Sequence, residues 1–273
     1  MPICRLPDAE LHYVEKGHGQ PLVFLSGLAG DHLYWLGQLR AFSKHYRCLA
    51  VDFRDVGQSS RASHGYGIES LADDLVGFLR SLQLPPAHIV GLSMGGMVAQ
   101  ELALRVPDRV RSLVLVNTVG RSDDWFQATL NAFQLIRQQV PDTASFFDAV
   151  LPWWVGQAFF TDSGRISWLR WLLRQNPHDQ PIDAFGRQID AIRGHDALER
   201  LRHITAPALI LSGADDLVAP GRYSRQLAER IPQAIQHNIP GVGHALPIED
   251  AGQFNGRLKE FLESFSTPQR SSA

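Results

Sequence analysis

The sequence predicts an α/β fold, in which a mostly parallel, twisted sheet is flanked by helices on both faces. Compact apolar runs alternate along the chain with stretches whose apolar residues recur at helical spacing. The links between them are short, as in other sheets of this kind. With 273 residues, of which 44% are hydrophobic, the chain can form one large domain or one domain that carries an insertion.

Strands are expected where a short apolar or alternating run is bounded by Gly, Pro or Asp. Segment 11–15 alternates like an early strand, and segment 21–27 is a compact apolar run closed by glycine. The remaining strands, in chain order, are expected over 46–52, 88–93, 110–117, 208–213 and the more weakly patterned 234–239. Runs of this length suit buried parallel strands better than helices.

Helices are expected where apolar residues fall on one face of a helix. Segment 68–82 places Leu71, Leu75 and Phe78 on such a face. Segments 96–106, 223–231 and 251–265 have a similar pattern. The last residues, 266–273, are polar and contain Pro, which predicts a frayed end.

Residues 122–197 interrupt the alternation, because they contain no convincing strand and hold about half of the chain's aromatic residues. We interpret them as a helical cap that folds over the sheet, so that 1–121 and 198–273 form the core domain. Most of these aromatic side chains are expected to build the cap's own core, since aromatic residues dominate burial. A minority should face a substrate pocket, and the candidates are Trp125, Trp153, Trp154 and Phe159.

Composition excludes several classes of function. The net charge is −2 and charges of both signs are interspersed, which gives no indication of nucleic acid or an anionic membrane surface. The start of the chain lacks the pattern of a signal peptide, and no apolar stretch approaches the roughly 20 residues that span a bilayer. The two cysteines, Cys4 and Cys48, predict neither a metal site nor a disulfide. A cytoplasmic protein without membrane partners is therefore expected.

The stretch G-L-S-M-G (91–95) follows a predicted strand and precedes a predicted helix. Small residues at 91 and 95 allow a tight turn that would lift Ser93 out of the sheet at a helix N-terminus. A serine hydroxyl becomes a nucleophile only when a base, a group that orients the base, and oxyanion donors are present. Ser93 is the candidate nucleophile, and the backbone N–H of Met94 is a candidate oxyanion donor; the alternative is an inert connection.

The candidate base is His244, which ends I-P-G-V-G-H after the last predicted strand. Asp215 and Asp216 follow the 208–213 strand, and sites in open α/β sheets gather at the carboxyl ends of strands. Either aspartate can orient His244 or cap a turn. Most other histidines lie in polar or helical surroundings and are expected to be solvated: His12, His18, His45, His64, His88, His178, His195, His203 and His237.

The second oxyanion donor is expected from S-G-L-A-G (26–30), the loop after the 21–27 strand. The N–H of Leu28 is the candidate, with Gly27 and Gly30 making room for the backbone. Ser26 is expected to support the loop by hydrogen bonding. The alternative is a glycine turn without a chemical role.

The chain resembles members of the α/β-hydrolase superfamily over nearly its whole length. The resemblance is carried by G-L-S-M-G-G (91–96), D-F-R-D-V-G-Q-S (52–59), G-A-D-D-L-V-A-P (213–220) and G-V-G-H (241–244). The order Ser, Asp, His is that of the family, and the family's spacing implies Asp216 rather than Asp215 as the acid. The chain is most similar to small-substrate esterases and lactonases, in particular the 3-oxoadipate enol-lactonase group.

Two positions depart from the family pattern. Ser26-Gly27 replaces the common His-Gly of the oxyanion loop, and Asp55 replaces the first glycine of Asp-x-Arg-Gly-x-Gly-x-Ser. We interpret Asp55 as structural, paired with Arg54 or Arg61. The alternative is that it narrows or charges the pocket.

The motifs together predict a serine hydrolase that cleaves a small carboxylic ester, lactone or thioester through an acyl-enzyme, with no cofactor and no metal. Hydrolysis of a C–C bond and cofactor-free perhydrolysis of the haloperoxidase type are alternatives that use the same triad. A small-molecule receptor on a hydrolase fold is an alternative from another class. The expected partner is a small ester or lactone substrate rather than nucleic acid or a membrane, and the chain is expected to be a monomer or homodimer.

Overall fold

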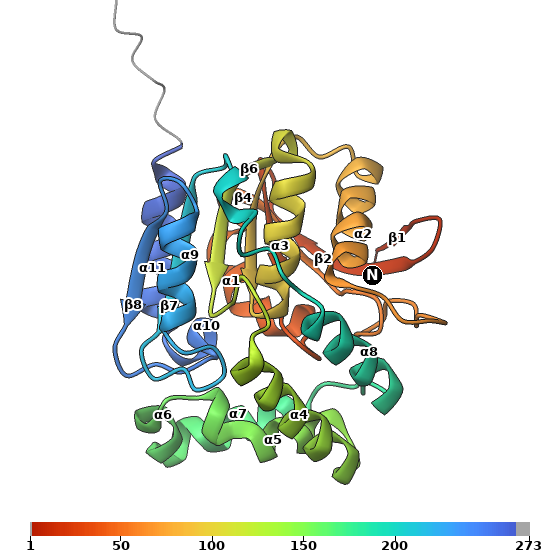
Figure 1. Ribbon diagram of the computed structural model, residues 1–273, viewed down its shortest axis with the longest axis vertical. Helices are drawn as coiled ribbons and strands as arrows, with labels where there is room; N and C mark the ends of the chain where they lie inside the picture. Colours follow the sequence, from red (N-terminus) through yellow and green to blue (C-terminus); the bar gives the residue numbers. More distant parts are fainter. Residues whose placement is uncertain (1, 266–273) are drawn as a thin grey trace, which may run out of the picture.

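A computed structural model describes residues 2–265 and has an eight-stranded sheet at its centre (Figure 1). The strands are β1 (Ile3–Arg5), β2 (Glu10–Lys16), β3 (Gln20–Leu25), β4 (Tyr46–Val51), β5 (Ala87–Leu92), β6 (Val110–Val116), β7 (Ala208–Gly213) and β8 (Ile235–Ile239). Their order across the sheet is β1-β2-β4-β3-β5-β6-β7-β8. The sheet is parallel from β4 to β8, whereas β1 and β2 are antiparallel at one edge.

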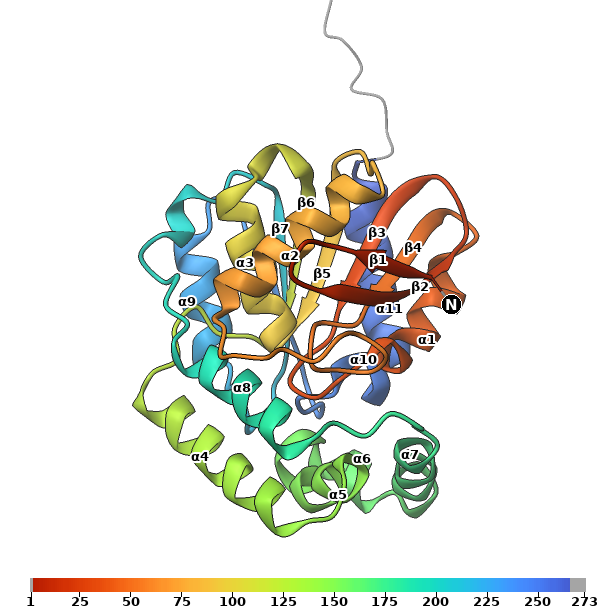
Figure 2. The ribbon, with the colours of Figure 1, turned by 90° about the vertical axis from the view of Figure 1, so that its right-hand side faces the viewer.

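Helices cover both faces of the sheet, because successive strand residues point to opposite sides. The core helices are α1 (Leu36–Phe42), α2 (Ile68–Ser81), α3 (Met94–Arg105), α9 (Arg222–Arg230), α10 (Leu246–Glu249) and α11 (Ala251–Glu263). Ile89 of β5 lies in an apolar cluster with residues of α2, α3 and α9. Its neighbour Val90 lies in a second cluster with residues of α1 and α11. Figure 2 shows the same arrangement from the side.

The predicted fold class is confirmed, and all seven predicted strands are present with ends shifted by at most two residues. The four predicted core helices are present as α2, α3, α9 and α11. Strand β1 and the short helices α1 and α10 were not predicted, because elements of three to seven residues give little periodic signal. The frayed end predicted over 266–273 lies outside the described residues.

Five helices occupy the cap segment, the name used below for residues 122–197. They are α4 (Asp124–Gln139), α5 (Thr143–Trp154), α6 (Gln157–Thr161), α7 (Ser163–Arg174) and α8 (Ile182–Arg193). Within 122–195, all of which the structure describes, no residue belongs to a strand. Figures 1 and 2 show α4 to α7 as a layer below the sheet, from which α8 leads back toward it.

In the part of the chain that the structure describes, no helix combines the length and apolar character required to cross a bilayer.

Asp55 joins the loop after β4 to the cap segment. Its buried carboxylate accepts two hydrogen bonds from Arg187 of α8, at 2.9 and 2.8 Å. The expectation of a partner at Arg54 or Arg61 was wrong, because Arg54 pairs with Asp74 and Arg61 donates to a backbone carbonyl. Asp55 has a φ of +72°, a value that favours glycine, so the ion pair offsets a backbone cost at this position.

Replacing Arg187 by Met should lower the free energy of unfolding by about 3 kcal/mol, because the Asp55 carboxylate would stay buried without its cation. Asp55→Gly should cost less, since it removes the charge and suits the positive φ. Urea denaturation measures both changes. Arg193→Met on the same helix is the control, with an expected loss of about 1 kcal/mol or less. Equal losses for Asp55→Gly and Arg187→Met would contradict this account.

Candidate active site

Ser93 stands at a sharp turn between β5 and α3. Its φ is +52°, and its amide donates to the carbonyl of Val116 at 2.9 Å, which extends the sheet up to the turn. A Cβ on Gly91 would lie 2.3 Å from the carbonyl oxygen of Gly95, and one on Gly95 would lie 2.4 Å from that of Leu25. Only glycine at both positions lets the strand, the helix and the β3 loop approach this closely. The motif therefore holds Ser93 at the carboxyl edge of the sheet.

His244 and Asp216 are joined by a hydrogen bond of 2.8 Å between Nδ1 and Oδ2. The other carboxylate oxygen of Asp216 accepts the amides of Val218 and Ala219, each at 2.8 Å. Asp216 is buried, whereas Asp215 is exposed and its side chain makes no contact with His244. The residue pattern alone left open which aspartate orients the histidine, whereas the resemblance to the family implied Asp216; in the structure Asp216 both bonds to His244 and caps its own turn.

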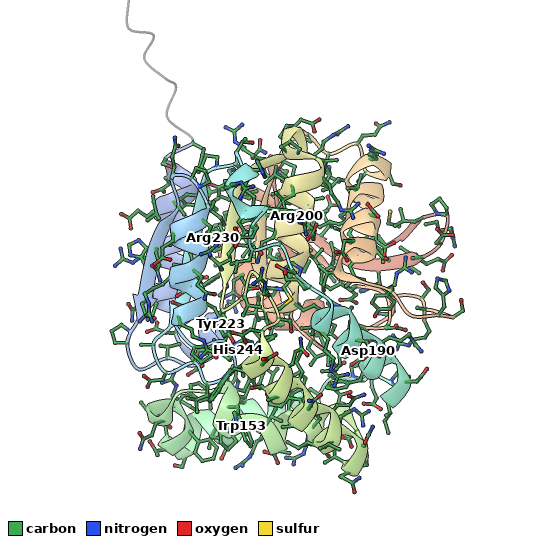
Figure 3. The ribbon with its side chains drawn as sticks, in the orientation of Figure 1. Trp153, Asp190, Arg200, Tyr223, Arg230 and His244 are labelled. Carbon is green, nitrogen blue, oxygen red and sulfur yellow. The ribbon has the colours of Figure 1, made fainter. Side chains whose placement is uncertain are left out.

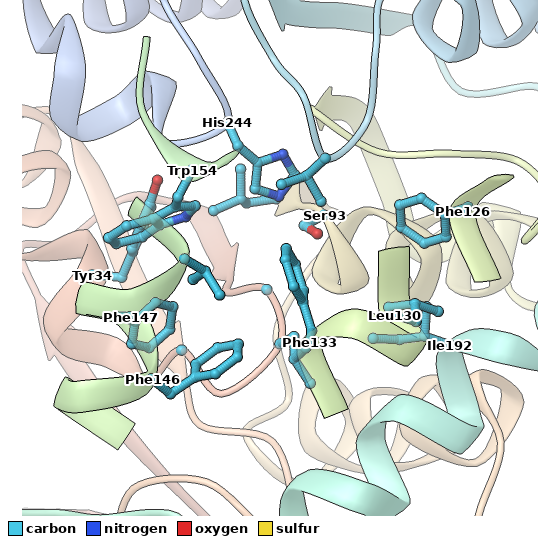
Figure 4. Close-up of a pocket in the computed structure, with 16 residues that line it drawn as sticks. Tyr34, Ser93, Phe126, Leu130, Phe133, Phe146, Phe147, Trp154, Ile192 and His244 are labelled. Carbon is cyan, nitrogen blue, oxygen red and sulfur yellow. The ribbon is translucent and has the colours of Figure 1, made fainter. Parts of the chain in front are cut away.

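Ser93 and His244 line the same small cavity of about 60 Å³ (Figure 4). Figure 3 shows His244 between the sheet and the layer of helices that contains α5, on which Trp153 lies. Among the described residues, the Ser93 hydroxyl has no hydrogen bond to His244. Catalytic hydrogen bonds are commonly long before a ligand is bound, so the arrangement is compatible with proton transfer between the two.

The loop after β3 passes close to Ser93, since a Cβ on Gly27 would lie 3.0 Å from the Ser93 Cβ. Ser26 supports this loop as expected, because its hydroxyl donates to the carbonyl of Asp31 at 2.9 Å. Gln188 of α8 accepts the amide of Ala29 at 3.0 Å. Within the described residues, the amides of Leu28 and Met94 donate no hydrogen bond, so both remain available to an anionic oxygen.

Of the four aromatic residues expected at the pocket, only Trp154 lines the cavity. Trp125 is 58% exposed on α4 and lies against the guanidinium of Arg222. Trp153, 39% exposed, packs against the far side of the cavity wall. Phe159 is buried in an apolar cluster formed mainly by α5, α6 and α7 and does not line the cavity. The expectation was too broad because aromatic density does not reveal which face of a helix meets the sheet.

The cavity wall consists mainly of one face of α4 and one face of α5. Its side chains that the sequence did not single out are Tyr34, Phe126, Leu130, Phe133, Phe146, Phe147, Val150, Ile192 and Val218. Phe126, Leu130 and Phe133 recur at helical spacing, as do Phe146, Val150 and Trp154. Helical spacing within the cap segment was the signal that could have identified them.

Asn117, at the end of β6, is a further residue that the sequence did not reveal. Its amide nitrogen donates to the carbonyls of His244 at 2.7 Å and Gly243 at 3.2 Å. Its amide oxygen accepts the N–H of Gly213 at 2.9 Å. One side chain thus connects the loop of His244 with the strand end that leads to Asp216. No pattern in the sequence indicates this contact.

Three histidines that were expected to be solvated are buried: His12, His88 and His195. His88 bonds to the hydroxyl of Ser112, and burial lowers its pKa to about 4. Burial likewise lowers the pKa of His195 to about 4. For His12 and His88 the expectation failed because a buried imidazole is stable when its ring nitrogen has a hydrogen-bond partner, here Asp52 and Ser112.

His12 belongs to a buried cluster with His32 and Asp52 below the oxyanion loop. Their ligand atoms lie within 4.8 Å of one another, close enough to hold a metal ion. However, the Nδ1 atoms of both histidines already bond to the Asp52 carboxylate, at 2.7 Å for His12 and 3.0 Å for His32. The Asp52 carboxylate also accepts the backbone amide of His32 at 2.6 Å. We therefore interpret the cluster as a hydrogen-bond network that anchors the loop.

The electrostatics of this cluster shift two pKa values in opposite directions. Burial alone would lower the pKa of His32, but the hydrogen bond and charge of Asp52 outweigh it and raise that pKa. Burial alone would raise the pKa of Asp52, but hydrogen bonds from His12 and His32 outweigh it and lower that pKa. Both shifts favour an ionised pair.

A second cavity of about 450 Å³ adjoins the first, and Gly30, Tyr34, Phe147 and Trp154 line both. Its far wall comes from the start of α5 and the end of α7, with polar residues such as Thr143, Ser145, Gln175, Asn176 and His178. The small apolar cavity at Ser93 therefore shares part of its wall with a larger and more polar one.

Comparisons with known proteins agree with this geometry. A family model described as alpha/beta hydrolase fold matches residues 20–251. The chain is 32% identical over 271 residues to "Putative carbamate hydrolase RutD" of Variovorax paradoxus (strain S110), which covers 94% of this chain and 98% of the relative. It is 29% identical over 263 residues to "Putative non-heme bromoperoxidase BpoC" of Mycobacterium tuberculosis (strain H37Rv), which covers 93% and 98%.

Among solved structures, the enol-lactonase from Burkholderia xenovorans LB400 matches with a TM-score of 0.85 and 30% identity. The match covers 96% of this chain and 100% of the lactonase. These findings confirm the resemblance inferred from the motifs, and they support a hydrolase.

The Asp52–His32 pair should make stability depend on pH. Because the pKa of His32 is raised, its contribution is complete below the unfolded value of 6.5 and is lost as the pH rises through the folded value. Because the pKa of Asp52 is lowered, its contribution is complete above 3.8 and is lost as the pH falls. His32→Gln should therefore cost more free energy of unfolding between pH 3.8 and 6.5 than at pH 9. Urea denaturation across pH tests this, and a pH-independent cost would refute it.

Proposed function

We propose that this chain, which belongs to the alpha/beta hydrolase fold family, is a serine hydrolase. The proposed substrates are small carboxylic esters, lactones or thioesters. The observation that supports this best is the combination at one cavity. Ser93, at its strained turn, faces the same small space as a histidine that is already bonded to a buried aspartate. The proposal assigns the base to His244, the group that orients the base to Asp216, and the oxyanion donors to backbone amides beside the same cavity.

In this proposal, the Ser93 oxygen attacks the substrate carbonyl carbon while Nε2 of His244 takes the hydroxyl proton. Asp216 stabilises the resulting imidazolium through the Nδ1 hydrogen bond and keeps the ring oriented. The negative charge that develops on the carbonyl oxygen is held by the amides of Leu28 and Met94, which lie at a loop and at the start of α3.

Collapse of the tetrahedral intermediate breaks the bond to the leaving group, to which His244 returns the proton. The product is an acyl-enzyme at Ser93. Water then attacks the acyl carbon with His244 as the base, and the acid product leaves with the Ser93 hydroxyl restored. This sequence needs no cofactor and no metal.

The two cavities suggest how a substrate is divided. The apolar space of about 60 Å³ at Ser93 suits a small acyl group, because most of its wall is aromatic and aliphatic. The adjoining space of about 450 Å³ has more polar side chains in its wall and suits a larger leaving group with hydrogen-bonding substituents. For a lactone, the two parts belong to one molecule.

The names of two relatives support two other reactions as alternatives. Carbamate hydrolysis uses the same attack on a carbonyl, and a relative with 32% identity is named as a carbamate hydrolase. Perhydrolysis would replace water by hydrogen peroxide at the acyl-enzyme, and a relative with 29% identity is named as a bromoperoxidase. The acyl-enzyme is common to all of these reactions, so the substrate and the second nucleophile distinguish them.

Ser93→Ala should lower kcat by about 10⁴-fold or more, because the nucleophile is absent. The test uses a panel of esters, lactones, thioesters and carbamates, with and without hydrogen peroxide, and labelling by an organophosphonate. Ser122→Ala, which removes another buried hydroxyl outside the cavity, is the control and should keep wild-type kcat. Turnover by Ser93→Ala at the wild-type rate would eliminate this mechanism. Binding of panel compounds without turnover or labelling would favour a receptor.

Asp216→Asn should lower kcat by roughly 10³-fold, because an amide cannot stabilise the imidazolium and favours the wrong tautomer. Asp215→Asn removes the same charge one residue away and should keep kcat within about twofold, since surface charges act weakly. Steady-state kinetics on the best panel substrate compares the two. Similar losses in both variants would show that the choice of Asp216 is mistaken.

A further inference from the structure

Glu249, at the end of α10, is a buried carboxylate that none of the steps above uses. It is 4% exposed, and no basic side chain among the described residues pairs with its carboxylate, whereas Arg165 donates to its backbone carbonyl. Its oxygens instead accept three backbone amides, those of Gly156 at 2.7 Å, Gly243 at 3.0 Å and Ala245 at 3.2 Å. Burial raises the pKa of Glu249, while these amide hydrogen bonds oppose the increase.

Two of the three amides belong to the residues on either side of His244. The loop therefore curves around the carboxylate, in the way that successive amides enclose an anion. The carbonyl of His244 is held by Asn117 at 2.7 Å, and its ring is held by Asp216 at 2.8 Å. The flanking amides are two further polar groups of this backbone, and the Glu249 carboxylate accepts a hydrogen bond from each.

The third amide belongs to the cap segment. Gly156 lies in the turn between α5 and α6, two residues after Trp154, whose side chain lines the cavity at Ser93. The carbonyl of Trp154 also accepts the amide of Ala245 at 3.0 Å. A Cβ on Gly243 would lie 2.6 Å from the nitrogen of Gly156, so the two backbones are in direct contact. The carboxylate of Glu249 thus joins the cavity wall to the loop of His244.

We propose that Glu249 is a positioning residue, which fixes the position of His244 relative to Ser93. Through the same carboxylate, the position of His244 is coupled to that of the 154–156 turn. The inference rests on the proposed role of His244 as the base. Proton transfer requires the base within hydrogen-bond reach of the nucleophile, so a shift of this loop acts on the chemical step. Of the 154–156 turn, only Trp154 lines the outer cavity, so binding of substrate there should change less than the chemical step.

The first arm of the test compares Glu249→Gln with Asp250→Asn. Gln keeps one acceptor but brings an NH₂ group against backbone donors, which displaces the loop. Asp250 caps α11 through Gln253 and bonds neither to the loop of His244 nor to the 154–156 turn. Asp250→Asn therefore removes one negative charge, as Glu249→Gln does, without affecting either segment. Glu249→Gln should lower kcat about tenfold or more, with KM changed less than about threefold. Asp250→Asn should keep kcat within about twofold of wild type.

The second arm measures hydrogen exchange and does not depend on turnover. The amides of Gly156, Gly243 and Ala245 should exchange faster in Glu249→Gln than in wild type and in Asp250→Asn. If Glu249→Gln does not fold, Gly156→Ala replaces it, because its Cβ would lie 2.7 Å from the Gly241 oxygen and push the turn away. The same fall in kcat is expected.

A folded Glu249→Gln enzyme with wild-type kcat overturns the inference, whatever its exchange rates. So does unchanged exchange at all three amides. A wild-type protein without activity that depends on Ser93 overturns the proposed function instead, and faster exchange in Glu249→Gln would then show only the contact between cap segment and loop.

Discussion

The close contact of backbones around Ser93 is the constraint on which the site depends. Strand β5 and helix α3 meet so tightly that a Cβ on Gly91 would lie 2.3 Å from the Gly95 carbonyl oxygen. This contact fixes the path of the chain and holds Ser93 at φ +52°, a backbone conformation that persists only when its surroundings determine it. The hydroxyl consequently projects from the carboxyl edge of the sheet, where the loops after β3, β7 and β8 meet.

The loops at that edge are held by side chains from other elements rather than by their own sequence. Asn117, from the end of β6, donates to the carbonyl of His244 and accepts the amide of Gly213. It therefore links the loop after β8 with the end of β7. Asp216 uses one oxygen for its own turn and the other for His244. Buried backbone polar groups require partners, so these contacts fix the loops at the same time as they satisfy them. Rigidity of this kind serves a site whose groups must meet within hydrogen-bond distance.

The cap segment covers the site and also supports the loops that form it. Its α8 bonds to the loop after β3 through Gln188 and to the loop after β4 through Arg187. Faces of α4 and α5 form the apolar wall at Ser93, whereas Trp168 and Trp171 of α7 are exposed. The same helices therefore shape the cavity and support the loops beneath it. Substrate preference and the geometry proposed for catalysis are consequently linked through one segment.

Among the described residues, the sequence by itself determined seven of the eight strands, four of the six core helices and the positions of Ser93, His244 and the Ser26–Gly30 loop, because glycines, apolar runs and strand ends are local signals. Only the tertiary structure decided the partners. Asp55 pairs with Arg187, 132 residues away, and His12 is buried against Asp52. Which helix faces line the cavity also depends on how the cap segment lies on the sheet. Contacts of this kind depend on where distant segments meet, and no local pattern of residues encodes that.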